Sequence, residues 1–155
     1  MDFEFSGDGD ALSGLMASGT PWYIGGLRFE CTGCGGCCGG APGYVWVDDA
    51  EIATLAAAVG MSSADFEKQY VRRVGSRGRS LKERPDGDCV LLSAADRRCM
   101  AYAVRPRQCR TWPFWDSNLA TRAHWDLAAA GCPGCNCGER VPFDKIEQRR
   151  KEIEV

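Results

Sequence analysis

The apolar residues of segment 48–60 recur with the period of an α-helix, and its ends carry residues that start and stop one. Asp48 and Glu51 form the pattern of a capping box, and Gly60 suits the turn that follows a helix. Four apolar side chains share one face of this predicted helix: Ile52, Leu55, Ala56 and Val59. We expect this face to pack in the core.

Boundary residues predict four further helices. They occupy residues 62–70, 105–114, 121–131 and 143–155. In the first of them, Phe66 and Tyr70 should point into the core. In the second, Pro106 suits the start of a short helix and Pro113 its end, because proline fits the first helical turn but not the interior.

Strand-forming residues occupy 44–47 and much of 71–92, with a turn expected at 85–87. The strand that begins at Cys89 should form a hairpin with the segment that begins at Cys99, so that these two thiols lie near each other. The sequence therefore predicts a small single α+β domain of short helices and β-hairpins.

The composition is that of a globular protein with one unusual component. Of the 155 residues, 45% are hydrophobic and 26% are charged, and the formal net charge is -2. No stretch is apolar for long enough to span a membrane, and the first residues lack the pattern of a secretory signal. We therefore expect a cytoplasmic protein without a membrane or nucleic-acid partner. The expected organisation is a flexible N-terminal arm (1–27), a cysteine-rich domain (28–138) and a charged C-terminal helix or tail (139–155).

The unusual component is a set of ten cysteines. Four lie in the sequence CTGCGGCC of residues 31–38, where two overlapping pairs have the C-x-x-C spacing that lets two sulfurs bind one metal ion. The intervening glycines permit the tight turns that such binding needs. In a reducing cytoplasm, clustered cysteines bind metal or carry out redox chemistry more often than they form disulfides. A disulfide-built secreted domain is the alternative.

Residues 31–38 do not complete a simple site, because the adjacent side chains of Cys37 and Cys38 tend to point apart. Isolated cysteines must then supply further ligands: Cys89, Cys99, Cys109 and Cys132. Eight sulfurs suit two four-sulfur sites or one polynuclear cluster with bridging thiolates. Cys135 and Cys137 fall in a glycine-rich, exposed-looking loop. We interpret them as lying outside the site, with extra ligands or a redox pair as the alternatives.

Basic and aromatic residues surround one isolated cysteine. Arg105 and Arg110 flank Cys109, and their positive charge would lower the thiol pKa and favour ligation. Three aromatic residues should pack around the site, because small cysteine-rich cores lack aliphatic bulk: Trp112, Phe114 and Trp115.

These residues resemble the cysteine-cluster family named for its CxxCxxCC signature. The similarity lies in CTGCGGCC at 31–38, GDC at 87–89, Cys99, YAVRPRQCRTWPF at 102–114 and CPG at 132–134. It extends over about residues 28–135. The resemblance implies a zinc- or iron-chelating domain, sometimes described as iron–sulfur-containing, whose biological role is undefined. It also implies eight metal ligands: Cys31, Cys34, Cys37, Cys38, Cys89, Cys99, Cys109 and Cys132.

Thiolate ligands suit both zinc and iron. The C-x-x-C-x-x-C start matches ferredoxins, and Cys132-Pro133 matches their terminal Cys-Pro, but the fourth cysteine of the cluster is adjacent to the third. An all-sulfur zinc site is ordinary, although two well-separated C-x-x-C units are absent. The expected cofactor is therefore zinc or iron, with an iron–sulfur cluster as one form of the iron.

Three functions follow from these features. The first is a metal-binding protein whose centre is structural, or which stores, delivers or senses metal or redox state. The second is an iron–sulfur protein in electron transfer or oxidoreductase chemistry. The third is a zinc-dependent nucleic-acid or protein adaptor that uses the basic segment 71–84, although an acidic chain favours a solvated face there. We expect His124, the one histidine, on the surface or in packing, which leaves little support for Cys/His catalysis. An enzyme acting on its own is not expected.

Overall fold

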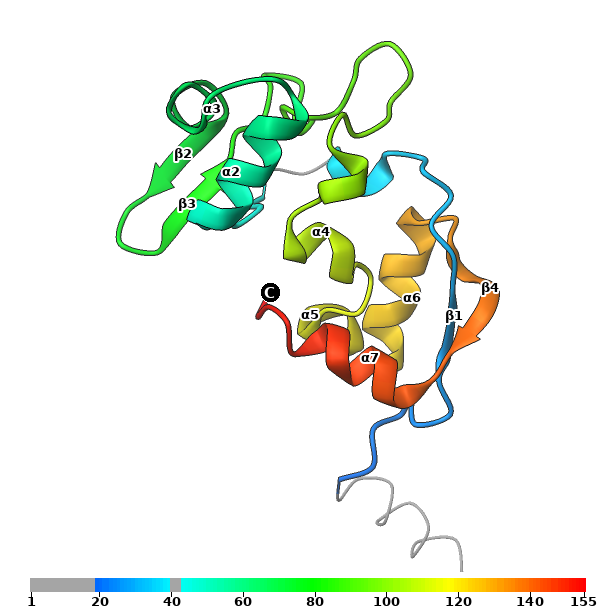
Figure 1. Cartoon of the computed structure of the whole chain (residues 1–155). Coiled ribbons are helices and arrows are strands. Elements are labelled where there is room, and N and C mark those ends of the chain that lie inside the picture. The colour runs from blue at the N-terminus through cyan, green and yellow to red at the C-terminus, as the bar shows by residue number, and fades with distance from the viewer. Residues whose placement is uncertain (1–18, 40–42) are drawn as a thin grey trace, which may run out of the picture.

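Two hydrophobic clusters of side chains organise the chain, and each is built on a two-stranded antiparallel sheet. The computed structural model describes residues 19–39 and 43–155 and has the mixed α+β architecture of a small single domain (Figure 1). The predicted α+β class of a small single domain is therefore confirmed, while most of the predicted N-terminal arm lies outside the described residues. Within those residues, no helix combines the length and the apolar character needed to cross a membrane.

The first cluster packs two helices against a hairpin. Its elements are α2 (Asp49–Ala58), α3 (Ser63–Tyr70), β2 (Val71–Val74) and β3 (Gly78–Leu81). Ile52, Leu55 and Ala56 are buried on the predicted face of α2, and Phe66 of α3 is fully buried against them. Burial of this helical face stabilises the cluster through removal of apolar surface from water.

Both ends of α2 follow from the sequence. The Asp48 carboxylate accepts from the Glu51 amide at 2.8 Å, and the Glu51 carboxylate accepts from the Asp48 amide at 3.0 Å, which completes the predicted capping box. Gly60 follows the helix with a φ of +73°, a conformation that glycine adopts without a steric penalty.

The segment after β3 differs from its prediction. The hairpin turn lies between β2 and β3, and residues 89–93 do not form a strand but turns with isolated bridges that pair Glu83 with Cys89 and Leu92 with Cys99. Polar side chains explain the difference, because Asp86 and Asp96 accept hydrogen bonds from backbone amides two residues ahead and so favour turns over a ladder. The expected turn at 85–87 is present.

The second cluster surrounds a sheet formed by two distant parts of the chain. Its elements are β1 (Leu27–Phe29), β4 (Cys135–Val141), α5 (Asp116–Leu119), α6 (Arg122–Gly131) and α7 (Phe143–Arg150). The glycine-rich loop expected at Cys135 and Cys137 is wrong, because both residues belong to β4. Gly134 instead permits close packing: a Cβ there would lie 2.2 Å from the carbonyl oxygen of Glu30.

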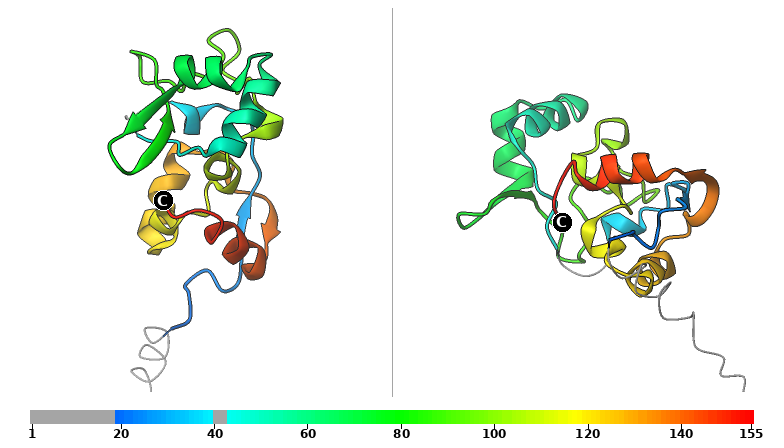
Figure 2. Two further views of the ribbon diagram at one scale, coloured as in Figure 1. Left: turned by 60° about the vertical axis from the view of Figure 1, so that its left-hand side comes forward. Right: turned by 90° about the horizontal axis from the view of Figure 1, so that it is seen from below.

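A short helix and a tight turn lie between the two clusters. They are α4 (Arg107–Thr111) and the 3-10 turn Gly36–Cys38, and their intermediate position is visible in Figure 1 and in both views of Figure 2. The predicted short helix at 105–114 is thus confirmed, with Pro106 as its N-cap. Most of the cysteine-bearing segments meet at this junction.

Candidate metal centre

The clustered cysteines lie on a loop that is fastened to the segment 88–97. Gly35 has a φ of +73°, and a Cβ there would lie 2.4 Å from the carbonyl oxygen of Arg97. The amide of Cys89 donates to the carbonyl of Cys38 at 2.7 Å. Glycine in the cluster therefore permits a close approach of two backbones, which brings the loop to the first of the isolated cysteines.

Five thiols from four segments influence one another's ionisation. They are Cys37, Cys38, Cys89, Cys99 and Cys109. The Cys37 and Cys38 sulfurs are 4.0 Å apart, and the hydrogen bond between them lowers the pKa of Cys37 and raises the pKa of Cys38. Burial raises the pKa of Cys89 and Cys99, and it raises the pKa of Cys109 to about 12.

Arg105 places a positive charge beside these thiols, as the sequence predicts. Its guanidinium lies 3.8 Å from the centre of the Tyr102 ring, and its charge acts to lower the pKa of Cys37, Cys99 and Cys109 against the effect of burial. The Nε of Arg105 is buried and has no hydrogen-bond partner among the described residues. A buried donor without an acceptor is costly, and an anionic thiolate centre would satisfy it.

Two cavities adjoin the thiols. The larger, of about 300 Å³, is lined by Cys37, Cys38, Cys89 and Cys109 together with aromatic rings, and the smaller, of about 270 Å³, is lined by Cys31, Cys37 and Cys109. Cys37 and Cys109 therefore line both, and so does Trp112. The predicted neighbour Arg110 lines the smaller cavity.

A second group of thiols lies at Cys135, whose neighbours are Cys137 and Cys132, the C-cap of α6. The indole Nε1 of Trp112 donates to the Cys132 sulfur at 3.4 Å. Burial, assisted by the nearby thiols of Cys132 and Cys137, raises the pKa of Cys135 to about 12. Cys135 is thus a buried neighbour of a predicted ligand, whereas the sequence predicted that it would lie in an exposed loop.

The two outer cysteines of the cluster reach different neighbours. The Cys31 thiol lies near Tyr102 and raises the pKa of that phenol. The Cys34 sulfur accepts from the amide of Gly36 at 3.4 Å, and a Cβ on Gly36 would lie 3.3 Å from the carbonyl oxygen of Gly131. The loop therefore also approaches the end of α6, one residue before Cys132.

The donor set has the right chemistry for a soft metal, but the coordination geometry is not formed. Across residues 19–39 and 43–155, no three Cys, His, Asp or Glu side chains converge closely enough to hold one ion. All ten cysteines are free thiols, so none is joined in a disulfide. The structure thus brings six of the predicted ligands into one region, but it does not show the metal centre around which we expected the fold to be organised. These six are Cys31, Cys37, Cys38, Cys89, Cys99 and Cys109.

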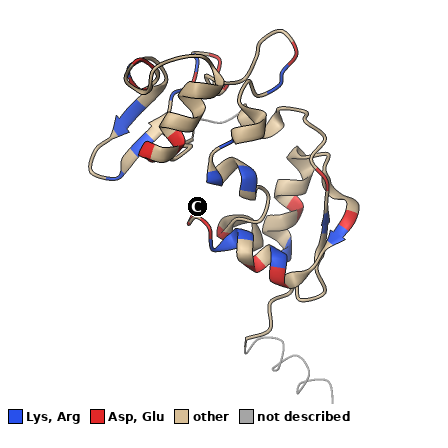
Figure 3. Ribbon diagram, in the orientation of Figure 1, with Lys and Arg blue, Asp and Glu red and all other residues tan. Residues whose placement is uncertain are grey.

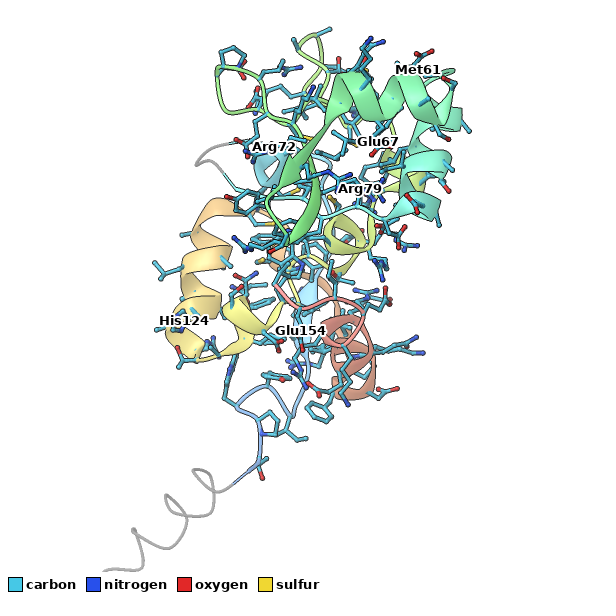
Figure 4. The ribbon with its side chains drawn as sticks, turned by 90° about the vertical axis from the view of Figure 1, so that its left-hand side faces the viewer. Met61, Glu67, Arg72, Arg79, His124 and Glu154 are labelled. Atoms are coloured by element: carbon cyan, nitrogen blue, oxygen red, sulfur yellow. The ribbon has the colours of Figure 1, made fainter. Side chains whose placement is uncertain are left out.

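The aromatic residues and the histidine that the sequence singled out differ in where they lie. Trp112 and Trp115 line the larger cavity, whereas Phe114 is fully buried and stacks on Trp125 in the second cluster. His124 is exposed on α6, where Figure 4 labels it. Sequence reasoning missed Arg149 of α7, which lines the smaller cavity and lies outside every cysteine motif.

Two arginines of the basic segment contact other residues of the protein. Arg79 forms an ion pair with Glu67 at 2.9 Å, and Figure 4 labels both residues. Arg79 also forms an ion pair with Asp49 at 2.5 Å. Arg72 lies 4.9 Å from the centre of the Tyr44 ring. These contacts support the interpretation of this hairpin as a structural and solvated surface.

A cysteine-rich domain whose thiols are drawn together from distant segments is the class that the fold and the site define. The chain belongs to the CxxCxxCC family, whose model is described as "Putative zinc- or iron-chelating domain" and matches residues 30–137. An uncharacterized protein of Methanocaldococcus jannaschii is 33% identical over 92 residues, which make up 59% of this chain and 48% of that protein. The chain thus spans about half the length of this curated relative. No solved structure matches the chain.

Proposed function

We propose that this protein chelates zinc or iron through eight cysteine thiolates. The proposed ligands are Cys31, Cys34, Cys37, Cys38, Cys89, Cys99, Cys109 and Cys132. The observation that supports this proposal is the gathering of five of these thiols from four segments, with the charge of Arg105 beside them. Membership of a zinc- or iron-chelating family agrees with it.

The pKa shifts explain why a metal ion would be needed. Burial opposes ionisation of Cys89, Cys99 and Cys109, so thiolates at these positions require a compensating cation. A bound metal ion supplies that charge and displaces the thiol protons. Because the ligands come from both hydrophobic clusters and from the segments between them, metal binding would also stabilise the fold.

Metal analysis of protein purified without oxygen tests the proposal. We expect tightly bound zinc or iron in a fixed ratio to protein, and a loss of thermal stability when a strong chelator removes it. Protein that carries neither metal and has the same unfolding temperature with and without chelator would contradict the proposal.

An iron–sulfur protein in electron transfer or oxidoreductase chemistry is the second candidate. The two cavities beside Cys37 and Cys109 favour it, because inorganic sulfide needs space next to the thiolates, whereas a structural zinc site is closed by its protein ligands. Visible absorption that bleaches on reduction, together with acid-labile sulfide, would identify this form. A colourless protein with zinc alone would exclude it.

A further inference from the structure

When its three thiols are protonated or bound to a metal ion, the smaller cavity contains more positive charge than its one carboxylate neutralises. Three arginines line it: Arg105 before α4, Arg110 on α4 and Arg149 on α7. Figure 3 shows basic residues on both of these helices. Among the described lining residues the one carboxylate is that of Glu30, which is exposed. Like charges around one cavity repel, so this arrangement favours a bound anion.

The three cavity arginines have no carboxylate partner, a state they share with Arg28, Arg73, Arg77, Arg98 and Arg140 elsewhere in the described residues. The residue after Arg149 shows the contrast, because Arg150 is paired with Glu147 at 2.8 Å and with Asp116 at 2.6 Å. Two consecutive arginines of α7 thus have different surroundings, one within a protein ion-pair network and the other at the cavity.

The nearby thiols explain the position of only one of the three arginines, Arg105. Arg105 lies beside them, and its charge favours their ionised forms. Arg149 comes from α7, outside residues 30–137, the segment that matches the family model. Its presence at the cavity is therefore not explained by the cysteine pattern.

The walls and size of the cavity indicate a small ligand. Phe29, Trp112 and Val141 provide apolar walls, which strengthen interactions with charge by excluding water. A volume of about 270 Å³ lies just below the usual range of ligand pockets. Guanidinium groups bind the two oxygens of a carboxylate or phosphate in a bidentate manner.

We propose that this cavity, which we call the arginine cavity, binds a small oxyanion, either a phosphate or a carboxylate. Arg105, Arg110 and Arg149 hold the anion beside Cys31, Cys37 and Cys109. The proposal goes beyond metal chelation, and it does not require that a metal be present. The protein would then have an exchangeable anionic ligand adjacent to its proposed metal ligands.

Calorimetric titration of the protein as purified, at low ionic strength, tests this site. Inorganic phosphate and succinate serve as separate probes and distinguish the two kinds of oxyanion. We expect saturable binding of one of them at millimolar concentration or below, and an increase in Kd of about tenfold in Arg149→Gln. The matched control is Lys145→Gln, which removes one exposed positive charge from the same helix and should leave the Kd within about twofold.

Metal content is measured on the same samples, so that the metal-chelation proposal and the anion-binding proposal can be contradicted separately. Anion binding without metal would overturn the chelation proposal alone. No saturable binding of either probe, or equal weakening by Arg149→Gln and Lys145→Gln, would overturn the arginine cavity alone. If Arg149→Gln does not fold, Arg110→Gln, which changes an exposed residue of α4, gives the same comparison, with the same tenfold increase expected.

Discussion

The amide of Cys89 donates a hydrogen bond to the carbonyl of Cys38 at 2.7 Å. This contact joins the last cysteine of the clustered loop to the first of the isolated cysteines through backbone atoms alone. The position of these two thiols therefore depends on the path of the loop as well as on any metal that they bind. Substitutions that move the loop should alter metal binding even when every thiol is retained.

Two glycines of the loop allow this dependence to be tested. Ala at position 33 or 35 would have a positive φ, which costs about 1–2 kcal/mol for a residue with a Cβ. At Gly35 the Cβ would also lie 2.4 Å from the Arg97 carbonyl oxygen, whereas at Gly33 it would meet nothing within 4 Å. We expect Gly35→Ala to lose bound metal and Gly33→Ala to retain it, as measured by metal-to-protein ratio after gel filtration. Equal metal content in the two variants would show that the contact with Arg97 does not position the ligands.

Cys109 should be essential for metal binding. It lies on α4 and lines both cavities, and burial together with the neighbouring thiols raises its pKa. Cys109→Ser should reduce the metal per chain by about half or more, because a four-sulfur site loses one of its ligands. The matched control is Cys137→Ser, which changes an exposed thiol on β4 and should keep the full metal content. Full metal content in Cys109→Ser, by elemental analysis, would remove Cys109 from the ligand set.

Gln108 should stabilise the position of the segment that pairs with β3. Its side chain is 5% exposed, accepts from the Trp46 amide at 3.0 Å and donates to the Tyr44 carbonyl at 2.8 Å. Gln108→Leu leaves both backbone groups without these partners and should lower the free energy of unfolding by about 2 kcal/mol. Gln148→Leu, at an exposed position of α7, should change it by less than about 0.5 kcal/mol. Urea unfolding with the metal content held equal distinguishes the two, and similar values would contradict the role of Gln108.

Glu147 gives the protein a component of acid sensitivity that is separate from the thiols. Hydrogen bonds from Arg150 lower its pKa from 4.5 to about 2, and the Tyr23 hydroxyl assists at 2.7 Å. A lowered pKa means that the folded state favours the carboxylate, so this stabilisation is present above pH 4.5 and is lost as the pH falls toward 2.

We expect Glu147→Gln to lower the free energy of unfolding at pH 7 by about 1 kcal/mol, a value reduced for solvent screening. The difference from the unsubstituted protein should shrink as the pH falls from 4.5 to 2. Denaturant unfolding across this range measures it, and thiol protonation is common to both proteins. Glu139→Gln, which changes an exposed carboxylate on β4, should show no such pH-dependent difference.

Local signals in the sequence predicted the helices well. The capping box at Asp48, the glycine after α2 and the Thr121 cap of α6 each depend on residues within a few positions of one another. The β-structure was predicted less well, because β1 pairs with β4 across more than a hundred residues and no local pattern specifies that pairing. Cys135 shows the consequence: glycine near it suggested a loop, whereas the glycine permits two strands to pack closely.

The candidate site, too, was predicted where its signals are local in the sequence and missed where it depends on packing. C-x-x-C spacing and the resemblance indicated which cysteines to consider, since those signals lie along the chain. Arg149 could not be found, because it reaches the arginine cavity only through the packing of α7. The buried position of Cys135 likewise depends on its pairing with Phe29 in the sheet of β1 and β4.

The location of α4 and the Gly36–Cys38 turn between two hydrophobic clusters has a thermodynamic consequence. Each cluster buries its own apolar side chains, so much of the cohesion between the two halves would come from the inorganic group held at their junction. Loaded protein would then melt in one cooperative calorimetric transition, and stripped protein in two. The metal would act as the coupling element that turns two small cores into one unit of folding.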